Sequence, residues 1–473
     1  MRQDVAPAIG LGLALHQYFK RNEPYPFKAL VTILGSDALL QAALQCDWNV
    51  TLRGVMESST ITAVALLASI AVYRLSPWHP LARYPGPWLH KLTKLRKYGP
   101  SFESVPPNEL SIADAAAVQP VYSGLPKDRW YRGRSPRDGG RSILALTGMW
   151  DRGLGQEQLL SYTESAERVA KQVVAHLDVA ADKGVAVNLT QWVRFFAMTS
   201  CPSSRTFGKE SGMTLTGQDP DGMIKKMSNV LVATDVNAHT VTYDLWHYLM
   251  DKDAPHKLTT IDLIREAAAG VIAGADTVAN ATICTVYLLL KNPRCMARVK
   301  SEVDRIVSSG SEPWADIEVH KDLPYLNACI DESLRLLSVV PVIGSRSVPA
   351  GSGGKIIASH FVPENTEVYV PPCVLHVSEK YFSPEPLAYH PERWLASEDH
   401  AGKWHTNRDA FIPFSVGAQN CVGKNLARIE MVLFLSMLIH QYDMSFAPDF
   451  DVEGFPDTMQ EHVVAEVGPM TFG

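Results

Sequence analysis

The chain has 473 residues, of which 46% are hydrophobic and 20% are charged, as in an ordinary globular protein of one large domain or two to three smaller ones. A net charge of −6 gives no indication of a nucleic-acid partner, because such a partner would require clustered Lys and Arg. The seven cysteines are scattered without a CxxC pair. This argues against a disulfide framework or a zinc site, and for a reducing, cytosol-facing body.

Residues 1–76 are predicted to be a membrane-anchor region, with up to three apolar spans at Val5–Phe19, Ala29–Gln45 and Ser58–Tyr73. The third is the best candidate, because it carries no charge between Glu57 and Arg74, and these two side chains can reach the membrane interfaces. The first stretch contains His16 and the second contains Asp37, so a buried helix pair is the alternative for them. Asn49 begins a glycosylation sequon that would matter only if its segment is lumenal.

A proline-rich connector is predicted at residues 77–90, where the sequence WHPLARYPGPW cannot form a helix or a central strand. Residues 91–473 are predicted to form the soluble body. Apolar residues recur there at helical spacing in 157–177, 259–290, 292–308, 324–338 and 422–440. Short strand-like runs lie at 355–362 and 366–372. The pattern predicts a mainly α fold with small β-sheets.

The stretch AAAGVIAGADTVANATICTVYLLL (267–290) is apolar nearly all round, so we expect a helix that is buried on most faces. Gly274, Asp276 and Thr277 stand in it where an ordinary core helix would have Leu or Ile. One interpretation is that the small residues allow close helix packing, and that Asp276 lies at the solvent-exposed end of the helix. The other is functional: Gly274 loosens the helix, and the acid and hydroxyl line a widened groove where protons are handled.

Two further segments carry charged residues within otherwise apolar or turn-forming sequence. Glu332 and Arg335 in PYLNACIDESLRLL share one helical face, although such a pair taken alone is usually a solvated surface pair. Arg393 follows in YHPERW, and His376 and His390 are interpreted as polar loop residues without a ligand role.

The strongest motif is PFSVGAQNCVGKNLARIEMVLFLSML (413–438), in which a turn-forming run leads into an amphipathic helix. Gly417 and Gly423 permit tight turns and a close approach of the backbone to a flat ligand. Cys421 at the helix start is near the positive end of the helix dipole, which favours the thiolate, the metal-binding form. A buried cysteine at a helix start would explain Cys421 but not the surrounding Phe-x-x-Gly-x-x-x-Cys-x-Gly frame.

This segment resembles the haem-binding loop of the cytochrome P-450 family, which usually reads Phe-x-x-Gly-x-Arg-x-Cys-x-Gly. The resemblance implies that Cys421 is the axial ligand of a haem iron, where a thiolate favours O–O cleavage. It implies that Phe414, Gly417 and Gly423 contact the cofactor. Gln419 departs from the pattern, because it stands where the family mostly has an Arg or His that pairs with a haem propionate. Gln brings no charge, so haem affinity would be lower.

The other motifs occur in the order in which the family carries them. The resemblance implies that Glu332, Arg335 and Arg393 form a buried ion network that braces the haem-side core, a network that is costly to break. It implies that Thr277 hydrogen-bonds dioxygen while Asp276 relays protons.

The likeness is weaker in three places. Arg346 is placed like a family arginine that contacts a propionate, but a surface arginine is the alternative. SILALTGM (142–149) stands where the family has a basic stretch, and residues 210–258 are few for the two helices that roof the substrate pocket. The chain therefore resembles a family member shortened in its N-terminal half.

The resemblance implies a mainly helical haem-thiolate monooxygenase, anchored in the endoplasmic reticulum membrane, that inserts one oxygen atom from O2 into a lipophilic small molecule. Electrons would come from NADPH through a separate reductase. The anchor and the YPGP and WDR segments are similar to those of filamentous-fungal members, many of which act in secondary metabolism. The alternatives are a degenerate or non-catalytic haem-binding relative, and a haem-thiolate isomerase or dehydratase, against which the intact Asp276–Thr277 pair argues.

Overall fold

A computed structural model gives the fold, and it describes residues 5–22, 26–45, 52–84, 109–127, 150, 153–201, 213–219, 270–395, 402–461 and 465–472. The chain forms two compact units, residues 1–110 and 111–473. The Asn49 sequon, residues 85–90 of the predicted connector, the stretch 142–149 and most of 210–258 lie outside the described residues.

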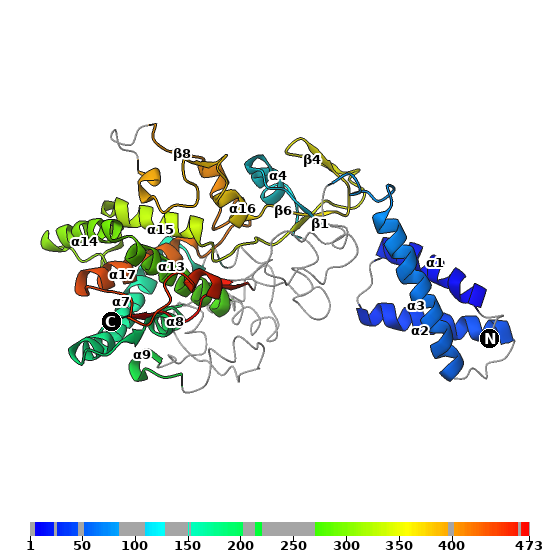
Figure 1. Cartoon of the computed structure of the whole chain (residues 1–473), viewed down its shortest axis with the longest axis horizontal. Helices are drawn as coiled ribbons and strands as arrows, with labels where there is room; N and C mark the ends of the chain where they lie inside the picture. The colour runs from blue at the N-terminus through cyan, green and yellow to red at the C-terminus, as the bar shows by residue number, and fades with distance from the viewer. Residues whose placement is uncertain are drawn as a thin grey trace. The chain divides into compact units, whose positions relative to one another are not determined.

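The described residues of the first unit form three helices: α1 (Val5–Asn22), α2 (Pro26–Gln45) and α3 (Leu52–Leu75), coloured blue in Figure 1. They match the three predicted apolar stretches. The Thr62 hydroxyl of α3 donates to the Ala8 carbonyl of α1 and to Asp37 of α2. His16 of α1 meets Ser69 further along α3, so α1 and α3 run parallel to each other.

Among the described residues, three helical segments are long and apolar enough to cross a membrane, namely Phe27–Leu44, Arg53–Leu75 and Ile272–Lys291. The last is mostly buried within the second unit, so it is a core helix. The predicted span 58–73 falls within the second segment. The predicted stretch 5–19 is not among the three, because α1 ends in the polar run Lys20-Arg21-Asn22.

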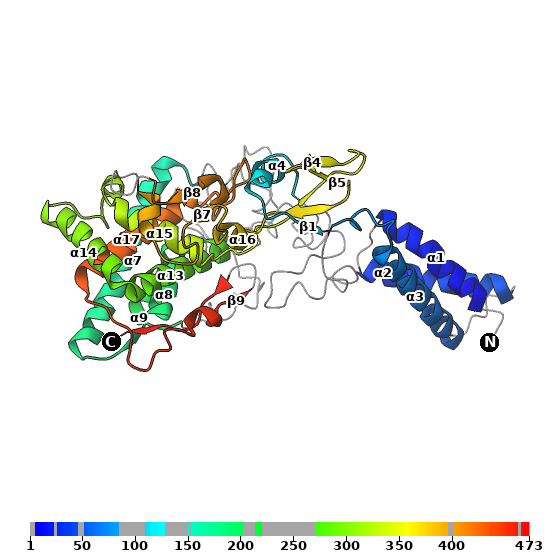
Figure 2. The same ribbon diagram turned by 45° about the horizontal axis from the view of Figure 1, so that its top comes forward.

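The second unit is mainly helical, as predicted, and its core lies around α13 (Figures 1 and 2). Helix α13 packs against α8, α14, α15 and α17 and buries nearly every side chain, as its all-round apolar sequence requires. The α-helices of this unit are α4 (Val118–Tyr122), α7 (Gln156–Asp182), α8 (Leu189–Ser200), α9 (Met213–Thr216), α13 (Thr277–Lys291), α14 (Pro293–Ser308), α15 (Pro324–Leu336), α16 (Pro372–His376) and α17 (Lys424–Gln441).

Helix α15, which carries Glu332 and Arg335, is fixed at its start. Pro324 occupies the first turn, where its missing N–H costs nothing. The Glu302 carboxylate of α14 accepts the backbone N–H groups of Tyr325 and Leu326, both at 2.9 Å. These donors have no partner within the helix, so Glu302 satisfies them and holds α15 in place.

The sheets are short. One has three strands in the order β1–β6–β3, and the other four are strand pairs, among them the hairpin β4–β5. The run 355–362 is not a single strand but this hairpin, because Ala358 and Ser359 both adopt positive φ and form a two-residue turn. The strands are β1 (Glu109–Ser111), β2 (Val187–Asn188), β3 (Arg346–Ser347), β4 (Lys355–Ile357), β5 (His360–Val362), β6 (Glu367–Tyr369), β7 (Phe382–Ser383), β8 (His405–Thr406), β9 (Gln460–Glu461), β10 (Ala465–Glu466) and β11 (Thr471–Phe472).

Candidate haem-thiolate site

The loop before α17 presents Cys421. The backbone N–H of Cys421 donates to the Phe414 carbonyl at 2.8 Å and closes the loop on itself. Gly417 adopts a φ of +81°, and a Cβ at this position would collide with Ser123, which follows α4. Only glycine satisfies both conditions, so Gly417 allows the loop to pack closely against Ser123; its predicted close approach to a flat ligand stays a prediction.

The Cys421 side chain is exposed, yet the surrounding protein raises the pKa of its thiol. The backbone N–H of Gly423 and the charge of Lys424 act in the opposite direction and lower that pKa. Desolvation is the larger effect, so the pKa of the thiol lies above its ordinary value. A metal ion at the sulfur would displace the proton, because a coordinating thiol is deprotonated.

Two predicted propionate contacts have different surroundings. The Oε1 atom of Gln419 is buried and has no hydrogen-bond partner among the described residues. The Arg346 side chain is fully buried, so the surface-arginine alternative is wrong. Its Nη1 donates to the carbonyls of Gly344 at 3.0 Å and Ser345 at 3.3 Å, and its guanidinium lies 5.1 Å from the ring centre of Tyr122.

The structure brings Glu332, Arg335 and Arg393 together in one buried cluster, so the solvated-pair alternative is wrong. Arg335 binds both carboxylate oxygens of Glu332 at 2.8 Å, and Arg393 Nε binds one of them at 3.0 Å. The indole N–H of Trp394 donates to Glu332 Oε2 at 2.9 Å, and the His390 backbone N–H to Oε1 at 3.0 Å. Both carboxylate oxygens of Glu332 thus have two hydrogen-bond donors or more, as a buried ion network requires.

His376 is a residue that the sequence interpretation missed. The sequence predicts a polar loop residue here, but His376 ends α16 and is fully buried. Its Nε2 accepts the backbone N–H of Ile412 at 3.0 Å, and its carbonyl accepts Arg335 Nη1 at 2.7 Å. His376 therefore joins the ion network to the segment that leads into the Cys421 loop.

The predicted oxygen-activation segment is not a regular helix. Ile272–Asp276 forms a π-helical turn directly before α13, a distortion that is frequent at functional sites. The Thr277 hydroxyl donates to the Ala273 carbonyl at 2.6 Å, so its proton is engaged and its lone pairs point elsewhere. Both Asp276 and Thr277 are half-buried rather than enclosed.

Gly274 in the π-helical turn faces Cys201, the residue after α8. A Cβ at Gly274 would lie 2.8 Å from the Cys201 sulfur, closer than side chains can pack. The sequence predicts that Gly274 loosens the helix. The structure adds a second reason for glycine here, which is the close approach of a side chain that follows α8.

Glu430 is a second residue without a sequence-based prediction. It lies on the core face of α17 and is buried, and its Oε1 accepts the Ser200 hydroxyl of α8 at 2.9 Å. Burial raises the pKa of this carboxyl to about 7. In the amphipathic pattern of α17 a polar residue would be placed on the solvent side, so only the fold reveals this position.

The donor set fits a haem with an axial thiolate. The exposed Cys421 lies in the loop in which Gly417 adopts a positive φ. Nearby, the buried Gln419 oxygen lacks a partner among the described residues. No group of three His, Cys, Asp or Glu that could hold a metal ion occurs in the described part of the chain. Cys421 could supply one thiolate ligand to an iron whose other ligands come from haem.

Comparisons with known proteins agree with this site. A sequence model named Cytochrome P-450 matches residues 223–470, just over half of the chain. Cytochrome P-450 67 of Uromyces fabae is 26% identical, with 93% of each chain covered. Cytochrome P-450 monooxygenase ORF11 of Penicillium roqueforti is 26% identical over 81% of this chain and 93% of its own. The monooxygenase aba2 of Botryotinia fuckeliana is 27% identical over 84% and 90%.

The alignment with the Uromyces fabae protein extends over 522 positions, more than the 473 residues of this chain. The relative therefore has residues that this chain lacks. With the family matched over more than half of its length, and with similar relatives along most of it, the chain belongs to the cytochrome P-450 family and is a monooxygenase of that type.

Proposed function

We propose that this monooxygenase inserts one oxygen atom from O2 into a C–H or C=C bond of a lipophilic small molecule in fungal secondary metabolism. The observation that carries the proposal is the exposed Cys421 sulfur at the end of a glycine-turned loop. Haem bound at this thiolate supplies the reductive activation of dioxygen. The similar monooxygenases of Penicillium roqueforti and Botryotinia fuckeliana support the fungal assignment.

The residues of the loop would hold the cofactor. Cys421 is the metal ligand, and Phe414, Gly417 and Gly423 shape the surface against one face of the ring. Gln419 and Arg346 would serve the propionates. Of these two residues only Arg346 is charged. Its guanidinium is already oriented by hydrogen bonds to the backbone carbonyls of Gly344 and Ser345.

The π-helical turn would handle protons. The Thr277 hydroxyl donates to Ala273, which fixes the side chain and leaves its oxygen free to accept a hydrogen bond from a protonated group. Asp276 is half-buried beside it, so it can exchange protons with solvent and pass them inward. Glu332, Arg335 and Arg393 have no part in the chemistry and brace the core beneath the loop.

The partners follow from the chemistry. We expect electrons from NADPH through a separate reductase, and a body that faces the cytosol from the endoplasmic reticulum membrane. Helices α2 and α3 are apolar enough to anchor it.

The test is the absorption spectrum of the reduced, carbon-monoxide-bound protein. A thiolate ligand gives a strongly red-shifted Soret band, and Cys421→Ser should abolish it because a hydroxyl is a far poorer ligand. Cys373→Ser on α16 is the matched control and should keep the band. A band that survives Cys421→Ser would overturn the assignment of the ligand. A wild-type protein that binds haem but shows no product with any lipophilic substrate class would favour the degenerate relative.

A further inference from the structure

The proposed function leaves the packing of the first unit unexplained. Helices α1 and α3 touch along a tight seam, because a Cβ at Gly12 would lie 2.7 Å from the Thr62 carbonyl oxygen and 2.9 Å from Ala65 Cβ. The Thr62 hydroxyl donates to the Ala8 carbonyl across the same seam. Small residues that allow such contact are typical of helix pairs in membranes. The two helices therefore form a fixed surface rather than two independent anchors.

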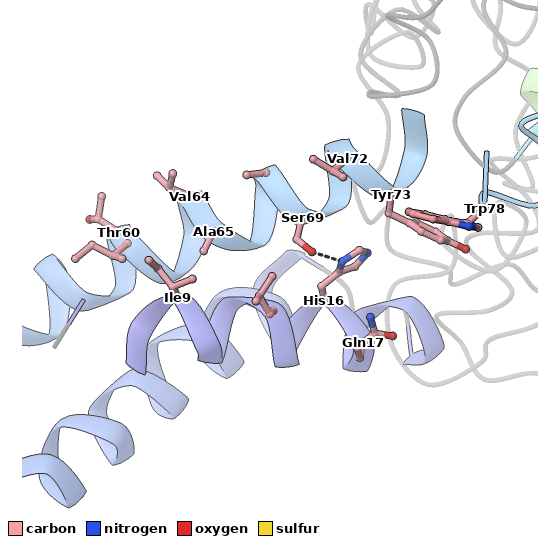
Figure 3. A pocket seen from close by; sticks show the side chains of 13 residues that line it. Ile9, His16, Gln17, Thr60, Val64, Ala65, Ser69, Val72, Tyr73 and Trp78 are labelled. Atoms are coloured by element: carbon pink, nitrogen blue, oxygen red, sulfur yellow. Dashed lines mark hydrogen bonds between the residues drawn. The ribbon is translucent and has the colours of Figure 1, made fainter. Parts of the chain in front are cut away.

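A groove of about 720 Å³ lies along this pair and is shown in Figure 3. Its walls are almost entirely apolar over most of its length, and small side chains of α3 form part of them. The lining residues are Ile9, Leu13, His16, Gln17, Thr60, Ile61, Val64, Ala65, Ala68, Ser69, Val72, Tyr73 and Trp78.

One end of the groove is polar and cationic. His16 and Ser69 are joined by a 2.7 Å hydrogen bond there, and the His16 ring packs edge-on against Tyr73 (Figure 3). The Lys20 ammonium lies 3.9 Å from the centre of the Tyr73 ring. Arg74 follows Tyr73 in the last turn of α3, so two cationic side chains, Lys20 and Arg74, belong to this end of the groove.

The length of the groove matches one leaflet of a bilayer. Thr60 to Tyr73 covers about 20 Å of helix at 1.5 Å per residue, close to the roughly 20–22 Å of one leaflet with its headgroup layer, of which about 15 Å is hydrocarbon. These residues belong to Arg53–Leu75, which is apolar enough to cross a membrane. The cationic end lies next to Leu75, where α3 ends, so it would reach the headgroup layer.

We propose that this groove binds one acyl chain of an anionic phospholipid, with its phosphate between Lys20 and Arg74. An apolar slot of leaflet depth fits a hydrocarbon chain, and two cations at one end fit an anionic head better than a neutral lipophilic molecule. The proposal requires that the first unit is inserted in the membrane, and it is independent of what the haem domain oxidises.

The experiment uses the full-length holoprotein in phosphatidylcholine bilayer discs. A minor fraction of the lipid carries a photoactivatable acyl chain on either phosphatidylserine or phosphatidylcholine. Labelled peptides are mapped by mass spectrometry after irradiation. We expect label in the peptides that contain residues 9–17 and 60–73, with about thirtyfold preference for the anionic lipid, as two cations near the surface would give at about 1 kcal/mol each.

Paired variants separate charge from shape. Lys20→Gln with Arg74→Gln should remove most of the anionic preference, whereas Lys20→Arg with Arg74→Lys should keep it. Lys28→Gln is the matched control, because Lys28 is exposed at the start of α2 and does not line the groove. Ala68→Leu narrows the groove and should lower labelling by both lipids, whereas Ala43→Leu on the exposed face of α2 should not.

The outcomes are distinct. Equal labelling by both lipids, or a preference that survives loss of both cations, would show bulk lipid around the helices and overturn the proposal. Crosslinks between two copies of the groove would show that a second chain fills it, and would also overturn the proposal. The reduced carbon-monoxide band, recorded for every variant, reports whether the haem domain is folded. Lipid labelling does not depend on catalysis, so its failure is distinguishable from failure of the proposed oxygenation.

Discussion

The imidazole of His376 accepts a hydrogen bond from the backbone N–H of Ile412 at 3.0 Å. The carbonyl of the same residue accepts Arg335 Nη1 at 2.7 Å. One histidine thus connects the buried ion network of α15 to the segment nine residues ahead of Cys421. Through these two hydrogen bonds, we expect the network to influence the position of the loop that carries Cys421.

His376→Ala should loosen the loop and leave the Ile412 N–H without its acceptor. We expect a loss of about 2–4 kcal/mol in the free energy of unfolding, from the unpaired donor and the cavity together. Haem content should fall with it. His405→Ala, at an exposed position of β8, should change neither quantity. Calorimetry measures the stability, and haem content per chain is measured separately. A His376→Ala protein with full haem content and wild-type stability would contradict the positioning role.

The same histidine should make the protein sensitive to acid. Burial, and then the charge of Arg335, lower the pKa of His376 from 6.5 to about 3. The unfolded chain therefore takes up a proton below pH 6.5 that the folded chain refuses. Neutral His376 therefore makes its full contribution to the free energy of unfolding above pH 6.5. Below that pH the contribution falls toward pH 3, by at most about 1.4 kcal/mol per pH unit. The difference in stability between wild type and His376→Gln should shrink between pH 7 and pH 4. A constant difference would count against the assignment.

Glu430 should give the opposite pH dependence. Burial raises the pKa of its carboxyl to about 7, above the ordinary value of 4.5. Its stabilising effect is therefore complete below pH 4.5 and is lost as the pH rises to 7. Glu430→Gln keeps an acceptor for Ser200 without a charge, so the variant should gain stability relative to wild type from pH 5 to pH 8. Glu318→Gln, at an exposed ion pair, is the control. Melting temperatures across this range that stay parallel for Glu430→Gln and wild type would refute the prediction.

Periodicity predicts much of the helical fold. The run 324–338 is α15 at Pro324–Leu336, and 422–440 is α17 at Lys424–Gln441, because the spacing of apolar residues reports which face is buried. The turn before α17 is also visible in the sequence, since Gly417 stands at the position where the structure has a positive φ. That Cys421 is the metal ligand at this turn stays a prediction.

What the sequence could not show are the polar residues that the fold buries. His376 follows a Pro-Pro pair, which is typical of a loop, and its burial depends on Arg335 and Ile412 from other segments. Glu430 lies in an amphipathic helix, where periodicity assigns a polar residue to solvent. The sequence predicts the π-helical turn only as a loosened helix, because the partner of Gly274 is Cys201, far away in the sequence.

Gly274→Ala tests that contact. The added methyl would meet the Cys201 sulfur at 2.8 Å, so we expect a displaced π-helical turn and misplaced Asp276 and Thr277. The absorption spectrum of the reduced, carbon-monoxide-bound protein should stay nearly normal. Hydrogen peroxide should replace product, because the displaced side chains no longer deliver protons to the correct position. Cys201→Ala removes the obstructing sulfur, so the double variant should recover most of the coupling. Coupling that is normal in Gly274→Ala, or unrecovered in the double variant, would show that the contact has no such role.

The last prediction concerns the Gln419 oxygen, for which the described part of the chain offers no hydrogen-bond partner. Haem in this fold is held by the thiolate, by apolar contact and by cations at its propionates, and each charge-assisted hydrogen bond contributes roughly 1.5–3 kcal/mol. Gln419 supplies no charge, so we expect wild-type protein to lose haem readily. Gln419→Arg should slow that loss by about tenfold or more, at 1.4 kcal/mol per decade.

Transfer of haem to an excess of a haem-scavenging protein measures the rate without any turnover. Gln419→Lys is the informative comparison, because a lysine brings the charge but not the planar fork that binds a carboxylate through two donors. We expect it to give a smaller gain than arginine. Gln419→Glu should accelerate loss, since it places a second anion beside the propionates. If wild type already retains haem as firmly as Gln419→Arg, then another cation holds the propionates. Arg346 is the first to test, by Arg346→Lys, because it is the buried arginine on β3 that the family resemblance places there.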